Sequence, residues 1–290
     1  MMPSLPPGRG RANNFMEPNH NFQNPGAVFR PLDWTDSGPS VPHSGYRHVR
    51  PIRRRRSPAA AAGAVLLLGV VFPVLWAQNT DTQLYVVILK RPEKPLPQMP
   101  QQAADQLQKD HLANFRREFD EGKLIMAGPF TEDLAIRGIG IYRAHSNDEV
   151  TVWANSDPAV KAGRLAVELH GPLRLVNGDM QHRYDIVNLE RYAMVLSHRQ
   201  KTGDDHPAKQ AMSAHSAYLK GMFERGKLAL SGVLEGDGDY AEVLIYRTES
   251  TEAAALAAED PLEKIGYTKA EVHDWMTSKG VLPPGLPLKQ

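Results

Sequence analysis

Two histidines and two aspartates recur at matching spacings in this chain, and their side chains suit acid–base chemistry. Asp157 follows His111 after 46 residues, and Asp260 follows His215 after 45 residues. An imidazole has a reference pKa of about 6.5, so it takes up and releases protons near neutral pH. A neighbouring carboxylate could fix the tautomer of the ring and stabilise its charged form. The spacing therefore predicts two His–Asp pairs in which the histidine acts as a general acid or base.

The pairs belong to a longer internal repeat with an offset of 104 residues. At this offset Gly122-Lys123-Leu124 recurs as Gly226-Lys227-Leu228, and Ile141-Tyr142-Arg143 recurs as Ile245-Tyr246-Arg247. Most of the positions in between differ, yet the histidine is retained. Two long copies predict a tandem pair of domains, because solenoid repeats are shorter and more numerous.

Each of the four residues also has a purely structural interpretation. The histidines fall on apolar helical stripes and could be core residues bonded to a backbone carbonyl. Both aspartates precede proline, as in a turn that ends a helix. The stripes consist of Leu107, His111, Phe115 and Phe119 in the first copy and Ala211, His215, Leu219 and Phe223 in the second. The retention of both pairs keeps the catalytic interpretation open beside the structural one.

Other polar residues near the repeat fit a catalytic role less well. Asp120 is also close to His111 in sequence, but the second copy has Glu224 beside Arg225 at that place, so Asp157 is the favoured partner. His170 and His273 recur near the last strand of each copy, where we expect surface or structural roles. No ligand pair has a recognisable metal spacing, so we expect no metal at His111, Asp157 and His170.

Hydrophobic periodicity predicts the same order of elements, β-α-β-β-α-β, in both copies. This is the ferredoxin-like arrangement, whose sheet leaves one apolar face to be covered. We therefore expect an α+β protein in which two tandem ferredoxin-like domains form an intramolecular dimeric α/β-barrel-like pair. The first copy has predicted strands at 84–89, 123–127, 138–142 and 166–175 and helices at 101–121 and 148–155. The second has predicted strands at 192–197, 228–231, 241–247 and 267–275 and helices at 207–225 and 252–258.

Composition divides the chain further. Residues 1–57 carry nine arginines and three acidic residues, and their Pro, Asn, Gly and Ser content predicts a disordered basic tail. The rest of the chain is net acidic, which argues against a nucleic-acid partner. There is no cysteine, so disulfides and thiolate chemistry are excluded. The predicted parts are the tail at 1–57, an apolar segment at 58–80, copy one at 81–176, a linker at 177–190 and copy two at 191–290.

The apolar segment predicts export. An uncharged, apolar stretch at 59–77 follows Arg53-Arg54-Arg55-Arg56 and has about the length needed to cross a bilayer. The same order of basic and apolar regions is found in signal peptides. We expect either a cleaved signal peptide or a membrane anchor at 58–80. In both cases the C-terminal domains lie outside the cytoplasm, in a periplasmic or extracellular position, and the membrane is a partner only if the segment is not removed.

The motifs of the first copy resemble those of the YCII-related (YciI-like) domain family. The matching pieces are His111–Phe115, Asp120–Phe130 and Asp157–Gly163, and the resemblance covers 84–175 well and 192–275 more loosely. It implies a ferredoxin-like fold that assembles as a dimeric α/β barrel, with a His–Asp pair in a cleft. Some relatives are cofactor-free lyases or dehydrochlorinases acting on small cyclic compounds, and most have no established activity. The resemblance thus indicates the fold more strongly than the function.

Two functions follow as hypotheses. The first is a cofactor-free lyase or hydrolase that acts on an unidentified small organic molecule through His111 with Asp157 and His215 with Asp260. The second is a non-catalytic small-molecule-binding or structural module. Copy one is the better candidate, because its Gly128-Pro129-Phe130 motif reads Gly232-Val233-Leu234 in copy two. Since the chain carries its own partner domain, we also expect a monomer with an internal pseudo-dimer.

Overall fold

The computed structural model describes residues 81–94, 96–132, 135–200, 206–236 and 238–284. Two halves repeat the order β-α-β-β-α-α-β. The first half consists of β1 (Gln83–Lys90), α1 (Gln101–Asp120), β2 (Leu124–Pro129), β3 (Ile136–Ala144), α2 (Asn147–Ser156), α3 (Pro158–Lys161) and β4 (Ala166–Asn177). The second consists of β5 (Leu189–Arg199), α4 (His206–Glu224), β6 (Leu228–Leu234), β7 (Tyr240–Tyr246), α5 (Ser250–Ala258), α6 (Pro261–Lys264) and β8 (Thr268–Ser278).

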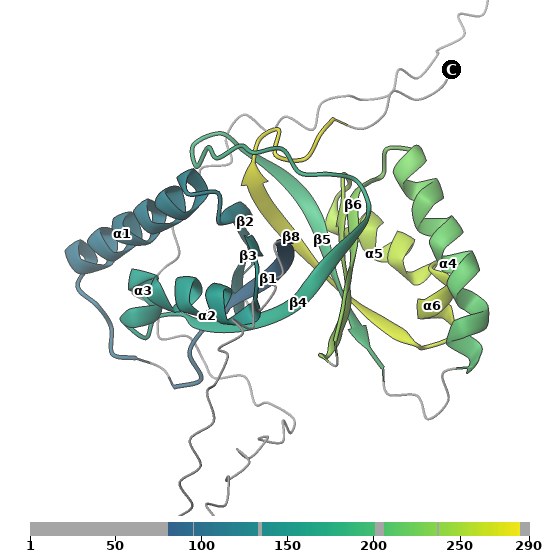
Figure 1. Cartoon of the computed structure of the whole chain (residues 1–290), viewed down its shortest axis with the longest axis horizontal. Coiled ribbons are helices and arrows are strands. Elements are labelled where there is room, and N and C mark those ends of the chain that lie inside the picture. Colours follow the sequence, from purple (N-terminus) through teal and green to yellow (C-terminus); the bar gives the residue numbers. More distant parts are fainter. Residues whose placement is uncertain (1–80, 95, 133–134, 201–205, 237, 285–290) are drawn as a thin grey trace, which may run out of the picture.

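All eight strands join one antiparallel sheet in the order β2-β3-β1-β4-β6-β7-β5-β8. Within each half the order is that of a ferredoxin-like domain. The halves are hydrogen-bonded through β4 and β6, where Leu173 pairs with Leu234 and Leu175 with Gly232. Figure 1 shows the helices of the two halves on opposite outer sides, with the strands between them. The predicted α+β pair of ferredoxin-like domains is confirmed.

A second seam brings β2 and β8 together and closes the sheet into a barrel. Phe130 forms an isolated bridge with Trp275, whose indole Nε1 donates to the carbonyl oxygen of Gly128 at 3.1 Å. Thr277 Oγ1 donates to the carbonyl oxygen of Ala127 at 2.9 Å. Gly128 and Gly232, which recur in the repeat, lie at the two seams. A Cβ at Gly128 would lie 1.7 Å from the Met276 oxygen, and a Cβ at Gly232 would lie 2.7 Å from Leu173 Cδ1. Only glycine leaves room for such close approach.

Strand alternation divides the apolar side chains among three cores. The largest core fills the barrel and draws on both halves, including Ile88, Ile139, Met194 and Trp275. The other two cores lie between each half's sheet and its own helices, one around Val87 and the other around Val195. The barrel interior is therefore shared, whereas each half has its own helix–sheet layer.

Helix α1 ends where the sequence predicts, and the reason is visible in the backbone. Gly122 has φ +72°, its amide donates to the Phe119 oxygen, and the amide of Lys123 donates to the Glu118 oxygen. Gly226 has φ +70° at the same point after α4. A left-handed residue of this kind stops a helix and returns the chain, and glycine adopts it without steric cost.

Two details differ from the sequence-based expectation. The short helices α3 and α6 were not predicted; they begin directly after Asp157 and Asp260. The strand predicted at 267–275 is present as β8, which pairs with β5 along its whole length although residues 268–271 also suit a helix start. The predicted linker 177–190 is shorter: Asn177 belongs to β4 and Leu189 begins β5, so the connector comprises residues 178–188.

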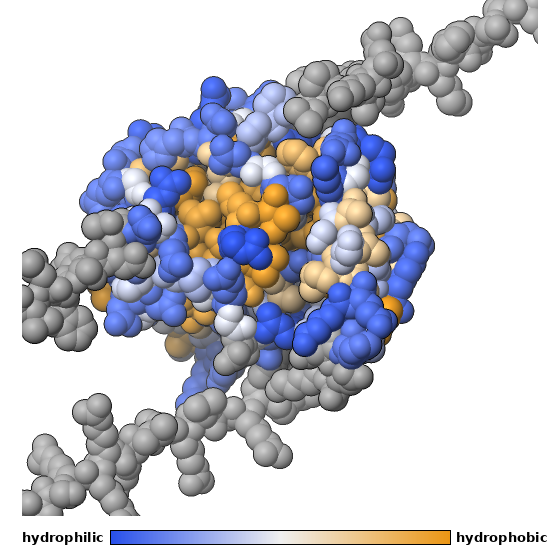
Figure 2. Space-filling view, turned by 45° about the vertical axis from the view of Figure 1, so that its right-hand side comes forward, coloured by the Kyte–Doolittle hydropathy of each residue, from blue (hydrophilic) through white to orange (hydrophobic). Residues whose placement is uncertain are grey.

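The predicted basic tail (1–57) and apolar segment (58–80) lie outside the described residues, and export stays a prediction. Among the helices of the described part, none is both long and apolar enough to cross a membrane. On the face shown in Figure 2, hydrophobic residues gather near the centre and hydrophilic residues surround them.

The shared barrel core leads to a prediction about assembly. Fragment 81–290 is expected to sediment as a monomer, because each half already covers the apolar sheet face of the other and the connector holds them at high effective concentration. Copy one alone, residues 81–178, is expected to dimerise or aggregate, because its barrel face would be exposed. A soluble, monomeric copy one in sedimentation velocity would contradict this.

Candidate functional site

The first predicted pair is formed in the fold. His111 Nδ1 lies 2.8 Å from Asp157 Oδ2, and both side chains are almost fully buried, with exposed fractions of 4% and 2%. Helix α1 supplies the histidine from its sheet-facing side, and the junction of α2 and α3 supplies the aspartate. With a carboxylate at Nδ1, that nitrogen carries the proton of the neutral ring, so Nε2 is its basic nitrogen.

Asp157 is held by more than the histidine. Its Oδ1 accepts from the amides of Ala159 at 2.8 Å and Val160 at 3.4 Å, so it is also the N-cap of α3. Its Oδ2 also accepts from Asn114 Nδ2 at 3.3 Å. The structural and the functional interpretations of this aspartate therefore apply together: the cap fixes the carboxylate, and the carboxylate fixes the imidazole.

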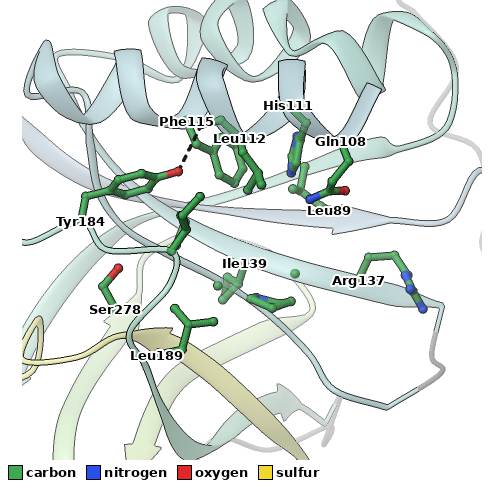
Figure 3. A pocket seen from close by; sticks show the side chains of 15 residues that line it. Leu89, Gln108, His111, Leu112, Phe115, Arg137, Ile139, Tyr184, Leu189 and Ser278 are labelled. Atoms are coloured by element: carbon green, nitrogen blue, oxygen red, sulfur yellow. Dashed lines mark hydrogen bonds between the residues drawn. The ribbon is translucent and has the colours of Figure 1, made fainter. Parts of the chain in front are cut away.

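His111 borders a pocket between α1 and the sheet of copy one. The pocket has about 570 Å³ of space not occupied by protein, part of it open to solvent, and its lining is mainly apolar. Figure 3 shows His111, Leu112 and Phe115 reaching from α1 toward Ile139 and Leu189 below. The other lining residues are Leu89, Gln108, Ala127, Gly128, Pro129, Arg137, Gly138, Tyr184, Ile186 and Ser278. Copy two contributes Leu189 and Ser278, so the wall draws on both halves.

The second predicted pair is also formed, but it has a third member. His215 Nδ1 lies 2.9 Å from both carboxylate oxygens of Asp260, and His215 Nε2 lies 2.9 Å from Glu242 Oε1. Burial alone lowers the pKa of His215, but the hydrogen bonds to Asp260 and Glu242 outweigh it and raise this pKa to about 10. His215 is therefore an imidazolium at neutral pH, fixed on both sides.

The position of Glu242 is one of those that differ between the two sites. Glu242 pairs with Val233 across β6 and β7, and Gly138 pairs with Pro129 at the equivalent place in β2 and β3. In copy two the Glu242 side chain reaches the histidine, whereas in copy one the equivalent Gly138 has no side chain and lines the pocket. Where copy two has a carboxylate bonded to its histidine, copy one therefore has a glycine that lines the pocket.

Sequence reasoning missed several neighbours of the histidines. Asn114, Glu118 and Glu242 are not part of the repeated motif, and only the helical stripe of His111 could have pointed to Asn114 and Glu118. Tyr142 Oη donates to Glu118 Oε2 at 2.9 Å. Burial raises the pKa of the Glu118 carboxyl, and it holds the pKa of Tyr142 well above its usual value. The polar layer beneath α1 is therefore larger than the His–Asp pair.

The remaining sequence candidates lie elsewhere. Asp120 is exposed and pairs with Arg116 at 2.9 Å, whereas Asp157 lies beside His111. His170 lies 2.8 Å from Glu168 and packs edge-on against Tyr240, while His273 packs against Phe130. Neither of these histidines is part of the His111 site. Within the described ranges no group of three or more His, Asp or Glu side chains is placed to hold a metal ion.

Comparisons with solved structures give distant similarities. A proposed chlorite dismutase is 10% identical, covers 68% of this chain and 94% of its own, and has a TM-score of 0.43. A proposed monooxygenase from Fusobacterium nucleatum is 11% identical, with coverages of 73% and 99% and a TM-score of 0.44. A haem-binding protein from Thermus thermophilus is 11% identical, with coverages of 69% and 93% and a TM-score of 0.42. At these values the similarity assigns neither ligand nor activity to this chain.

The sequence comparisons are more specific for copy one. No curated protein matches this sequence. The family described as YCII-related domain matches residues 83–169, a range that contains β1 to α3, the first four residues of β4 and the whole His111–Asp157 pair. Residues 83–169 thus match a YCII-related domain, and they include most of the residues that line the pocket.

Proposed function

We propose that copy one is a small-molecule enzyme in which His111 transfers protons and Asp157 orients it. The observation that carries the proposal is the buried pair beside an apolar pocket, in the half where Gly138 stands at the place of Glu242. A catalytic base must be both oriented and adjacent to a space for substrate. His111 meets both conditions.

The chemistry follows from the geometry of the pair. Asp157 accepts from Nδ1, so Nε2 takes a proton from the substrate, or from a water that attacks it, and the same ring returns the proton to the leaving group. Between these two proton transfers the ring is an imidazolium, and Asp157 stabilises its charge. The apolar wall lowers the local dielectric and strengthens this interaction. A lyase or hydrolase reaction of this kind needs no cofactor for its proton transfers.

The experiment is a turnover comparison on a substrate found by screening small organic molecules for stabilisation of the folded protein. His111→Asn is expected to lower kcat by about 10²–10⁴-fold, because general acid–base catalysis typically contributes that much. His145→Asn is the matched control, since His145 is exposed in the same copy. It should leave kcat unchanged.

The two copies should respond differently. His215→Asn is expected to leave kcat per folded molecule at the wild-type level, because His215 is enclosed by Asp260 and Glu242. Full turnover in His111→Asn would exclude the proposal. Equal losses in His111→Asn and His215→Asn would show that copy two also has a working site.

The apolar lining favours a second function, binding without chemistry. The side chains of Leu112, Phe115, Ile139 and Leu189 can contact an apolar ligand but cannot form hydrogen bonds with it. A ligand that binds in the pocket and is released unchanged, with equal affinity for wild type and His111→Asn, would support this alternative.

We also infer that the second half is a diverged copy of the same domain. Its elements follow the same order, and Asp260 caps α6 as Asp157 caps α3. Its histidine–aspartate pair is intact, but Glu242 converts it into a buried ionic cluster. Copy two then has a structural role: it completes the barrel and contributes residues to the wall of the copy-one pocket.

A further inference from the structure

The connector, residues 178–188, lies against α1 and takes part in the pocket. Tyr184 and Ile186 line it, and Leu189 follows directly at the start of β5. We propose that the connector determines which ligands copy one accepts, with Tyr184 as the residue that limits ligand length. This inference rests on the proposed ligand site at His111, and it assigns a specificity role to a segment that the sequence repeat does not contain.

Tyr184 is fixed in place by contacts with α1. Its hydroxyl donates to the Leu112 carbonyl oxygen at 3.2 Å, and its ring lies 5.3 Å from the Phe119 ring. The Arg116 guanidinium lies over the Tyr184 ring, 5.8 Å from its centroid. Burial raises the pKa of Tyr184 to about 12, so the phenol stays neutral and remains a hydrogen-bond donor across the physiological range.

The residues around Tyr184 fix the connector at further points. The His182 ring stacks on Phe119 with centroids 3.8 Å apart and an interplanar angle of 7°. The Gln181 amide donates to the Val281 oxygen at 2.6 Å, and the Asp185 amide donates to Ser278 Oγ at 2.9 Å. The connector is held by α1 on one side and by the end of copy two on the other. It therefore forms a fixed wall of the pocket.

Figure 3 shows why this wall limits ligand length. Tyr184 and His111 lie on different sides of the pocket in this view, with Leu112 and Phe115 between them. A ligand whose polar group meets His111 extends its apolar body along Leu112 and Phe115 toward the Tyr184 ring. A longer body must displace a ring that is held by a hydrogen bond and by Arg116.

The chain that follows β8 is placed differently. Its residues Val281 and Leu282 are buried in the barrel core, and the Pro283 oxygen accepts from Arg247. Within the described residues, the segment after β8 thus contributes to the barrel core, whereas the connector after β4 contributes to the copy-one pocket. The wall is a product of the tandem arrangement, because a connector exists only between covalently joined copies.

The test measures the affinities of a series of para-alkylphenols, from methyl to pentyl, for the full chain by isothermal titration. These probes carry one hydroxyl for His111 and an apolar body of graded length. For the wild type we expect affinity to rise with each carbon and then to fall beyond a cut-off length. Tyr184→Ala should move the cut-off by at least one carbon and tighten binding of the longest phenol about tenfold.

Three further variants complete the experiment. Tyr184→Phe keeps the ring and should keep the cut-off, and Val187→Ala, at a side chain that is 90% exposed, should do the same. Ile186→Ala should shift the cut-off in the same direction as Tyr184→Ala, which covers the case in which Tyr184→Ala fails to fold. An unchanged cut-off in both alanine variants of the pocket wall would overturn the proposal.

The outcome is distinguishable from that of the proposed function. A shifted cut-off combined with full turnover in His111→Asn would support the connector's role and reject the chemistry. Loss of turnover in His111→Asn with an unchanged cut-off would do the reverse. If no alkylphenol binds the wild type, the pocket does not accept such ligands and the connector proposal is rejected.

Discussion

Replacing Asp157 with alanine is expected to lower the free energy of unfolding by about 3–5 kcal/mol, because the molecule loses a helix cap and the acceptor of several buried hydrogen bonds. Its carboxylate is buried and accepts from His111, Asn114 and the first amides of α3. Removing it deletes the N-cap, worth about 1 kcal/mol, and leaves buried donors without an acceptor at about 1–3 kcal/mol each. Turnover should fall as well, by at least about 100-fold, because His111 loses the group that orients it.

Urea denaturation measures this loss as a lower midpoint at an unchanged slope. Asp110→Ala is the control, since Asp110 is exposed on α1, and it should change stability by no more than about 0.5 kcal/mol. Asp157→Asn separates the two roles: its amide oxygen still caps α3, but it no longer provides a carboxylate for His111. We expect it to retain more stability than Asp157→Ala while losing a comparable amount of turnover. Wild-type stability in Asp157→Ala would contradict the geometry described here.

His215 is expected to stay protonated well above neutral pH. Because its folded-state pKa is raised to about 10 from about 6.5, the stabilising contribution is fully present below pH 6.5 and is lost as the pH rises through 10. Two-dimensional NMR of the imidazole nitrogens should therefore show an imidazolium for His215 at pH 8. The free energy of unfolding should fall between about pH 7 and about pH 10.5.

Glu242→Gln tests the cause of this raised pKa. The change removes one of the two carboxylates that face His215, so the ring should titrate at a lower pH and stability should depend less on pH in the alkaline range. Glu252→Gln is the matched control, because Glu252 is exposed in the same half and pairs with Lys227 at 2.9 Å. A wild-type His215 that titrates near pH 6.5 would show that Glu242 and Asp260 do not act as described.

The repeated architecture and the two His–Asp pairs could be predicted from the order of residues. Periodicity is a local property, so strands such as β1 and helices such as α1 were predictable from their own residues. The helix stripe placed His111 facing the sheet, and the Asp-Pro step indicated a chain reversal at Asp157. Both pairs recur because each aspartate caps a short helix beside α1 or α4, which a recurring local geometry can enforce.

Which of the two sites is open depends on the folded arrangement of the strands. Glu242 and Gly138 each lie 27 residues after the histidine of their own copy. Their difference affects the histidines only because the fold places β7 and β3 beneath the helices that carry them. The role of the connector was equally hidden, since Tyr184 lies 72 residues from the Leu112 carbonyl that holds it. Hydrophobic patterns encode which face of an element is buried, but contacts between distant polar side chains depend on how the two halves close into one barrel. That closure fixes the distances on which charge, pocket and specificity depend.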